Sequence, residues 1–215
     1  LFPYTTLFRS ELEGMKIAGN TFDYPFIHGK AIQAAGNYSF VSCSDEAVEN
    51  GRVQLEHYPI VDFILGLEKD DIQSDPARKT YYKTFSSPMQ RLLTAYCQSG
   101  GNLLVSGEFT ETVLKYGYQS SLSDTRSGQI SGLGRTIQIP RLPNEKSYAV
   151  TAPDCIVPVG SAFPVFAYQP GQRSTGIAYK GDYRVFAMGF PFESIESETD
   201  RATVMAAILK FFGEK

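Results

Sequence analysis

Short apolar runs alternate with helix-like segments in the first third of the chain. Residues 15–19, 38–43 and 58–65 carry β-forming apolar side chains, and the last run is so continuously apolar that a strand covered on both faces is expected there. Helices are expected between these strands, over residues 28–35 and from an N-cap at Ser44 to Gly51. This alternation predicts successive β-α units.

The middle of the chain contains the most regular helix pattern. After Ser87-Pro88, which supply a cap and a first-turn proline, apolar side chains recur at helical spacing from Met89 to Tyr96. Gly100-Gly101 ends this helix and is followed by a strand over 102–107 and by another helix candidate over 108–116. This order predicts the central crossover of a parallel sheet.

The second half of the chain has shorter and less regular elements. Residues 119–143 are rich in Ser, Gly, Arg and Gln without periodicity, which predicts a long exposed connection or a small subdomain. A hairpin is expected to join residues 176–180 to 183–188 through a two-residue type II′ turn, and a last helix starts at 197–200. Pro and Gly separate three further short strands, for which antiparallel pairing is expected: 148–150, 156–159 and 165–168.

These elements together predict an α/β fold. It is a doubly wound, mostly parallel, flavodoxin-like sheet flanked by helices, with an antiparallel hairpin near the C-terminus. Residues 15–215 are expected to form a single domain, which the length of the chain permits.

The N-terminal residues 1–10, LFPYTTLFRS, resemble the translation of a common sequencing adapter. Residues 1–14 are therefore interpreted as an artefactual or disordered extension and set aside. The natural N-terminus is then expected to lie upstream, and the first partners expected for the domain are upstream domains of the same polypeptide.

Composition excludes several classes of function. A net charge of −3 and a pI near 5.5, with scattered Lys and Arg, leave no basic surface for nucleic acid. No apolar run approaches the roughly 20 residues of a membrane span. Cys43, Cys97 and Cys155 are widely spaced and the chain has two histidines, which argues against a metal site and against a disulfide framework. No cofactor is predicted.

Polar side chains that could carry chemistry are expected at the carboxyl ends of the strands, where open α/β sheets place their sites. A hydrolase would use Ser106, His28 and Glu193, although Ser106 stands in V-S-G-E and not in a G-x-S-x-G elbow. The candidate ligand-binding residues are Asn20, Asp23 and Glu108. Asp62 interrupts the apolar run 58–65 and needs a partner if it is buried.

Each of these residues also has a structural interpretation. His28 could hydrogen-bond to nearby backbone, and Glu193 could cap the last helix or pair with Arg201. Asn20 and Asp23 could cap and turn the loop before the first helix. The remaining cases concern packing: Ser106 is small enough for a tight strand exit, His57 is expected on the surface, and Cys97 is expected to be buried and inert.

Three stretches carry a resemblance to a known family: GNTFDYPFIHGKAI, LLTAYCQSGGNLLVSGE and GDYRVFAMGFPFESI. They resemble class I glutamine amidotransferase-like domains, and more closely the degenerate versions in bacterial carbohydrate-active proteins such as xanthan lyases. The resemblance covers nearly all of residues 15–215.

The resemblance implies a lost catalytic dyad. Active members of the family hold a cysteine after the central strand and a histidine and a glutamate near the end. Here the first position lies in Val105-Ser106-Gly107-Glu108 without cysteine, Glu193 matches the glutamate, and Pro191 stands where the histidine belongs. Without thiolate or imidazole, glutaminase activity is expected to be absent.

The leading hypothesis is therefore a non-catalytic binding or structural module of a larger bacterial protein linked to polysaccharide or cell-wall processing. The resemblance further implies secretion, or a periplasmic or cell-surface location, and a glycan as partner. The alternative is an enzyme, a hydrolase or polysaccharide lyase with Ser106, His28 and Glu193 in its cleft. A third option is a homo-oligomer, with the domain as a subunit interface.

Overall fold

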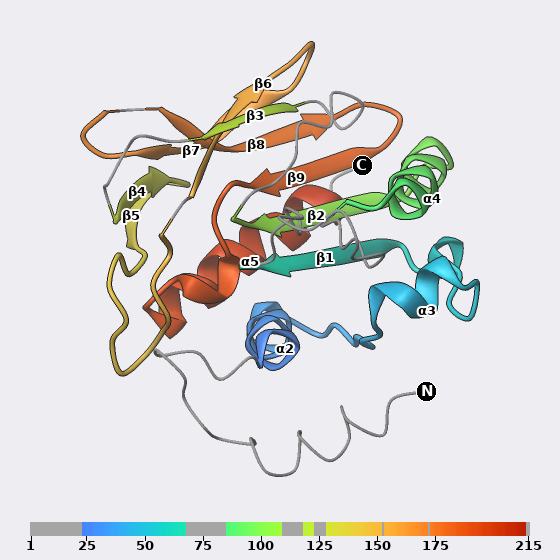
Figure 1. Ribbon diagram of the computed structural model, residues 1–215, viewed down its shortest axis with the longest axis horizontal. Coiled ribbons are helices and arrows are strands. Elements are labelled where there is room, and N and C mark those ends of the chain that lie inside the picture. Colours follow the sequence, from blue (N-terminus) through green and yellow to red (C-terminus); the bar gives the residue numbers. More distant parts are fainter. Residues whose placement is uncertain are drawn as a thin grey trace, which may run out of the picture.

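The computed structural model describes residues 23–67, 85–108, 118–122, 128–151, 153–171 and 173–213, arranged as Figure 1 shows. The helices are α2 (Tyr24–Ala35), α3 (Asp45–Glu49), α4 (Ser87–Gln98) and α5 (Glu198–Gly213), with single turns η1 (Leu55–His57) and η3 (Phe192–Ser194). The strands are β1 (Ile60–Gly66), β2 (Asn102–Gly107), β3 (Tyr118–Leu122), β4 (Gln129–Gly132), β5 (Arg135–Gln138), β6 (Asp154–Pro158), β7 (Phe163–Tyr168), β8 (Ser174–Lys180) and β9 (Arg184–Met188). Among these residues no helix is long and apolar enough to cross a membrane.

Seven of the strands form one mixed sheet in the order β1-β2-β9-β8-β7-β4-β5. β1, β2 and β9 run parallel to one another, whereas β8, β7, β4 and β5 each pair antiparallel with their neighbours. β3 and β6 form a separate antiparallel ribbon. Figure 1 shows the antiparallel part of the large sheet bending away from the parallel part.

The parallel part is buried on both faces. One face of β2 and β9 presents Leu104 and Phe186 to a core shared with α2 and α5. The opposite face presents Leu103 and Val185 to a second core shared with α4. Because consecutive residues of a strand point to opposite faces, a strand covered on both sides must be apolar throughout, which explains the unbroken apolar runs of this region.

The prediction of a doubly wound, mostly parallel flavodoxin-like sheet is wrong. Only three strands of the seven-stranded sheet are parallel, and four form a curled antiparallel extension. The extension comes from residues 128–180, where short strands and frequent Gly and Pro favour hairpins over crossover helices.

Several element predictions are confirmed, including the strand over most of 58–65, the helix predicted from Ser87-Pro88 and the last helix, although the N-cap of the middle helix is Ser86 and not Ser87. Two predicted strands, 38–43 and 148–150, are absent from the described part of the chain. Residues 38–43 are exposed and make no ladder with a neighbouring strand, which a strand requires. The strand predicted at 15–19 lies outside the described residues, and so does the helix predicted at 108–116 except for Glu108.

Two turns differ from expectation in length or kind. The hairpin of β8 and β9 pairs Lys180 with Arg184, so its loop has three residues and not the predicted two-residue type II′ turn. The irregular stretch 119–143 contains a hairpin of its own, in which Leu133 and Gly134 both have positive φ between β4 and β5. Positive φ at both positions is typical of a type I′ turn, but a leucine there carries no turn signal in the sequence.

Candidate functional site

Helix α2 carries one buried ionisable residue, His28. The helix begins just after Asp23 with a proline in its first turn, and it packs mainly against α5. Its buried residues are His28, Gly29 and Ala31, of which Gly29 lies against the ring of Phe40 and Ala31 belongs to the core on the side of the sheet and α5. A buried histidine has to find polar partners inside the protein.

Two carboxylates from distant parts of the chain supply those partners. His28 Nδ1 lies 2.7 Å from Asp62 Oδ2 of β1, and His28 Nε2 lies 3.2 Å from Glu193 Oε2 of η3. The Glu193 side chain is fully buried, and 17% of the Asp62 side chain is exposed. The ring also makes an edge contact with Phe192 at 4.7 Å between centroids. His28 therefore connects α2, β1 and η3.

The charge state of His28 follows from this arrangement. Burial alone would lower the pKa of the imidazole, but the charges and hydrogen bonds of Asp62 and Glu193 outweigh burial and raise that pKa to about 10. At neutral pH the ring is thus an imidazolium, with an N–H directed at each carboxylate.

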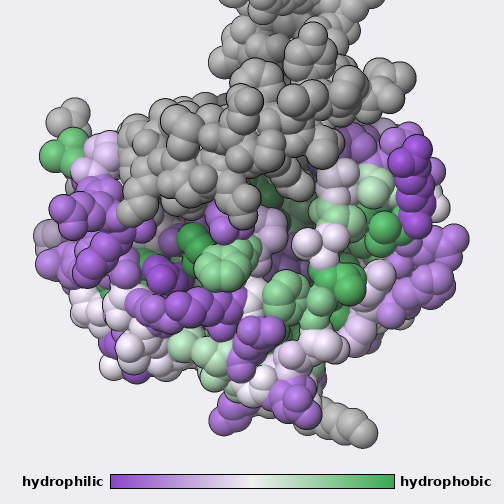
Figure 2. Space-filling view, turned by 90° about the horizontal axis from the view of Figure 1, so that it is seen from below, coloured by the Kyte–Doolittle hydropathy of each residue, from purple (hydrophilic) through white to green (hydrophobic). Residues whose placement is uncertain are grey.

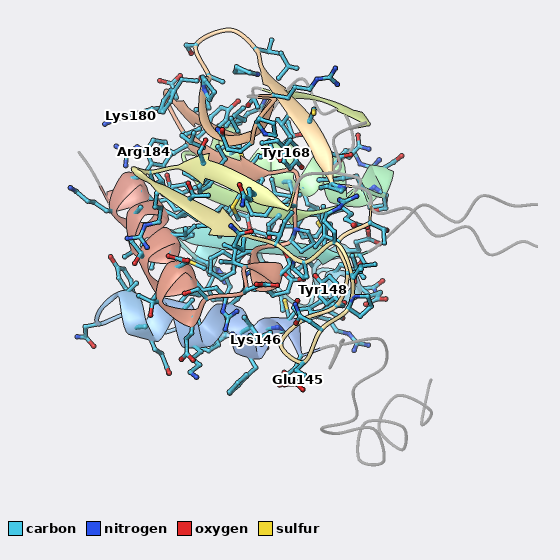
Figure 3. All side chains as sticks on the ribbon, turned by 90° about the vertical axis from the view of Figure 1, so that its left-hand side faces the viewer. Glu145, Lys146, Tyr148, Tyr168, Lys180 and Arg184 are labelled. Carbon is cyan, nitrogen blue, oxygen red and sulfur yellow. The ribbon has the colours of Figure 1, made fainter. Side chains whose placement is uncertain are left out.

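Tyr148 completes the cluster from the loop after β5. Its hydroxyl donates to Glu193 Oε1 at 2.7 Å, so Glu193 accepts from Tyr148 and from His28. Burial raises the pKa of Tyr148 far above its ordinary value, and the negative charges of Glu193 and Glu108 add to the rise. Figure 3 shows Tyr148 close to α2 and on the same loop as Glu145 and Lys146. We call Asp62, His28, Glu193 and Tyr148 the buried cluster.

Only part of the predicted hydrolase set comes together. His28 and Glu193 are in contact, but the Ser106 hydroxyl is buried and has no hydrogen-bond partner in the structure, so it is not bonded to His28 or Glu193. A serine nucleophile needs a neutral imidazole within hydrogen-bond reach, and His28 is charged with both ring nitrogens engaged. The arrangement does not form a Ser-His-Glu triad.

Of the predicted ligand-binding residues, the structure describes Glu108 and Asp23. Glu108 is buried beyond the end of β2, where its backbone N–H donates to Gly66 O at 2.9 Å. Asp23 is exposed at the N-terminus of α2 and makes no side-chain cap hydrogen bond. Asn20 lies outside the described residues.

Some of the structural interpretations of single residues agree with the structure and others do not. His28 bonds to carboxylates rather than to backbone, and Glu193 pairs with His28 rather than with Arg201, whose guanidinium donates to Ile195 O. His57 is on the surface as predicted. Cys97 is buried in the α4 core, and burial raises the pKa of its thiol to about 12, which agrees with an inert cysteine.

The sequence interpretation missed two members of the buried cluster as site residues. Asp62 gave a signal, because a carboxylate inside an apolar strand requires a partner. Tyr148 gave none, since it is one of 13 tyrosines and follows an irregular stretch. No group of three or more His, Cys, Asp or Glu in the described part of the chain is placed to hold a metal ion.

No protein-family model and no curated protein matches the sequence. Among solved structures, a cold-adapted β-galactosidase from Rahnella sp. R3 has a TM-score of 0.51 at 12% identity, with 87% of this chain and 26% of that chain covered. A catalytic mutant of Gan42B, a GH42 β-galactosidase from G. stearothermophilus, has a TM-score of 0.46 at 10% identity, covering 75% and 22%. The exo-β-1,4-mannosidase Op5Man5 from Opitutaceae bacterium strain TAV5 has a TM-score of 0.40 at 12% identity, covering 60% and 23%.

These neighbours are glycoside hydrolases and not amidotransferases. At 12% identity, the likeness to the Rahnella enzyme concerns the fold and not the activity. The chain spans about a quarter of the length of the three structures that it resembles.

Proposed function

We propose that this chain is a non-catalytic accessory domain of a larger protein that processes carbohydrate. The observation that carries the proposal is the state of His28, an imidazolium held between Asp62 and Glu193. A ring in this state takes up no proton at neutral pH, so it cannot activate Ser106 or a water molecule as a general base. The cluster instead holds α2 against β1 and η3.

The carbohydrate part of the proposal is supported by the protein in which a similar fold occurs. The Rahnella β-galactosidase contains a region of similar fold within a chain about three times as long. The resemblance of the sequence to degenerate amidotransferase-like domains of carbohydrate-active proteins points in the same direction. We include that family relation, and the secreted or cell-surface location it implies, in the proposal.

Exposed aromatic rings offer a means of contact with sugars. Figure 2 shows apolar side chains gathered in the middle of the face seen from below. In and after α2, three exposed aromatic residues are available for stacking on a sugar ring: Phe26, Tyr38 and Phe40. These exposed rings support a binding role over a purely structural one.

A turnover assay tests the absence of catalysis. The purified 215-residue chain is incubated with chromogenic aryl glycosides, aryl esters, xanthan and glutamine, and product release is compared with buffer alone. We expect no release above background in any assay. Saturable turnover that Ser106→Ala abolishes and His57→Gln leaves intact would establish the hydrolase alternative instead.

A binding assay tests the carbohydrate part separately. Calorimetry of the same chain against neutral and acidic polysaccharides is expected to show saturable heat with at least one of them. Phe26→Ala and Phe40→Ala are expected to weaken that binding, whereas the exposed Leu142→Ala, remote in sequence, serves as the control. The absence of binding heat with every polysaccharide tested would contradict the binding role.

A further inference from the structure

Asp62, a member of the buried cluster, and Ser106 lie on the same face of the parallel strands. In the β1–β2 ladder Asp62 pairs with Leu104, and Ile64 pairs with Ser106. Because residues two apart on a strand point to the same face, Ser106 shares the face of Leu104, which belongs to the core with α2 and α5. Asp62 and Ser106 are thus diagonal neighbours on the face that His28 approaches.

Each of these two side chains has a buried oxygen without a hydrogen-bond partner. The atoms are Asp62 Oδ1 and Ser106 Oγ, and Ser106 is fully buried. A buried polar atom that lacks a partner is unfavourable, so two such atoms on diagonal neighbours of one sheet face indicate a group that can bond to both. Both atoms are buried, but 17% of the Asp62 side chain is exposed, so Asp62 is the member of the pair that borders the surface.

Charge decides which kind of group fits. In the described residues, the ion pairs of Asp62 and Glu193 are both made with His28, so two carboxylates share one cation. This surplus of negative charge in a region of low dielectric favours a cationic donor over a neutral one.

We propose that Asp62 and Ser106 bind the ammonium group of an amino sugar. An ammonium carries three donors and no acceptor, so it can donate to Asp62 Oδ1 and to Ser106 Oγ at once. The serine hydroxyl then accepts, and the ammonium compensates the second carboxylate of the cluster. The choice of a sugar as the carrier of the amine rests on the proposed carbohydrate function.

Three matched sugars test the proposal by calorimetry on the 215-residue chain. Glucosamine carries the ammonium, glucose has a hydroxyl in its place, and N-acetylglucosamine has a neutral amide. We expect glucosamine to bind at least about tenfold more tightly than either neutral sugar, the effect of one charge-assisted hydrogen bond. Equal binding of glucose, or no binding of glucosamine, would overturn the proposal.

Two variants assign the binding to these side chains. Ser106→Ala is expected to weaken glucosamine binding by about fivefold or more without lowering the unfolding midpoint, because Ser106 Oγ makes no hydrogen bond in the protein. Asp62→Asn should remove most of the binding, and Ser161→Ala and Asp182→Asn, both exposed, serve as controls. If Ser106→Ala binds glucosamine as tightly as the parent does, the proposed ammonium site is refuted. This conclusion does not depend on whether Asp62→Asn folds.

The outcome is separable from that of the proposed function. Turnover of a substrate by the chain would refute the non-catalytic role and leave the ammonium site to be judged by the sugar series. Polysaccharide binding without a preference for glucosamine would refute only the ammonium site.

Discussion

Helix α2 holds two cations, two residues apart, that face opposite environments. His28 is buried between Asp62 and Glu193, with contacts of 2.7 and 3.2 Å. Lys30 reaches Glu198 of α5 at 2.6 Å, yet the two side chains are 54% and 62% exposed. The shorter contact is the weaker restraint, because water screens it and its long side chains lose entropy when they pair.

The difference lies in what each cation leaves behind when it is removed. Without Lys30, Glu198 is hydrated by solvent. Without His28, Asp62 and Glu193 face each other across the space of a lost ring, and Glu193 is fully buried. Breaking a buried pair is therefore expected to be far more costly than breaking an exposed one, whatever the net value of the intact pair.

The largest expected effect comes from His28→Gln. The amide keeps a polar side chain but removes the positive charge between two carboxylates, which is expected to lower the free energy of unfolding by about 3–5 kcal/mol. Urea unfolding followed by circular dichroism measures the loss. The exposed His57→Gln is the matched control and should unfold like the parent. A loss as small in His28→Gln as in His57→Gln would mean that the buried pairs do not hold α2.

The pH dependence of stability should distinguish the two cations next. The raised pKa of His28 means that the folded protein keeps a proton which the unfolded chain releases, between the ordinary pKa of 6.5 and about 10. The stabilisation is complete below pH 6.5 and is lost as the pH rises toward 10, with a slope of up to about 1.4 kcal/mol per pH unit. Unfolding at pH 6, 7, 8 and 9 should show this slope in the parent and not in His28→Gln. A flat parent curve over this range would contradict a buried imidazolium.

Tyr148→Phe is expected to have an intermediate effect. The change removes the hydroxyl that donates to Glu193 Oε1 and keeps the ring that packs against Tyr24. Losing a hydrogen bond to a buried charged acceptor should cost about 1.5–3 kcal/mol. The matched control is the exposed Tyr38→Phe. Equal stability of the two variants in thermal unfolding would show that Glu193 does not depend on Tyr148.

The buried cluster was only partly predictable from the sequence. His28 and Glu193 were expected at one end of the strands because open α/β sheets gather polar residues there, and Asp62 was expected to need a partner inside an apolar run. No local pattern indicates that His28 meets Asp62, because the contact spans 34 residues and depends on how α2 packs. The role of Tyr148 could not be predicted from the sequence, because this residue belongs to a loop without hydrophobic periodicity.

The two halves of the sheet were predictable to different degrees for a related reason. β2 is buried on both faces and β1 is at least half-buried along its length, and both have an apolar pattern that can be recognised from the sequence alone. β4 and β5 are four residues each, and their hairpin turns at Leu133 and Gly134, where the leucine takes a positive φ that sequence patterns do not indicate. Tertiary packing overrides local preference there, and the doubly wound prediction failed in this half.

The smallest effect is expected for Lys30→Ala, which removes the other cation of the comparison. Lys30 and Glu198 lie on the surface, and the pKa of Glu198 is lowered by its hydrogen bond with Lys30 and by the positive charge of that side chain. Solvent takes over both roles when the lysine is removed, so the unfolding midpoint of Lys30→Ala should equal that of the parent within error, at low salt and at high salt. Thermal unfolding at both ionic strengths measures this, and Glu198→Gln should behave in the same way. Suppose instead that Lys30→Ala destabilised the chain as much as Tyr148→Phe does. Burial would then not explain the difference between the two cations, and the contacts of His28 would stabilise α2 no more than the exposed pair does.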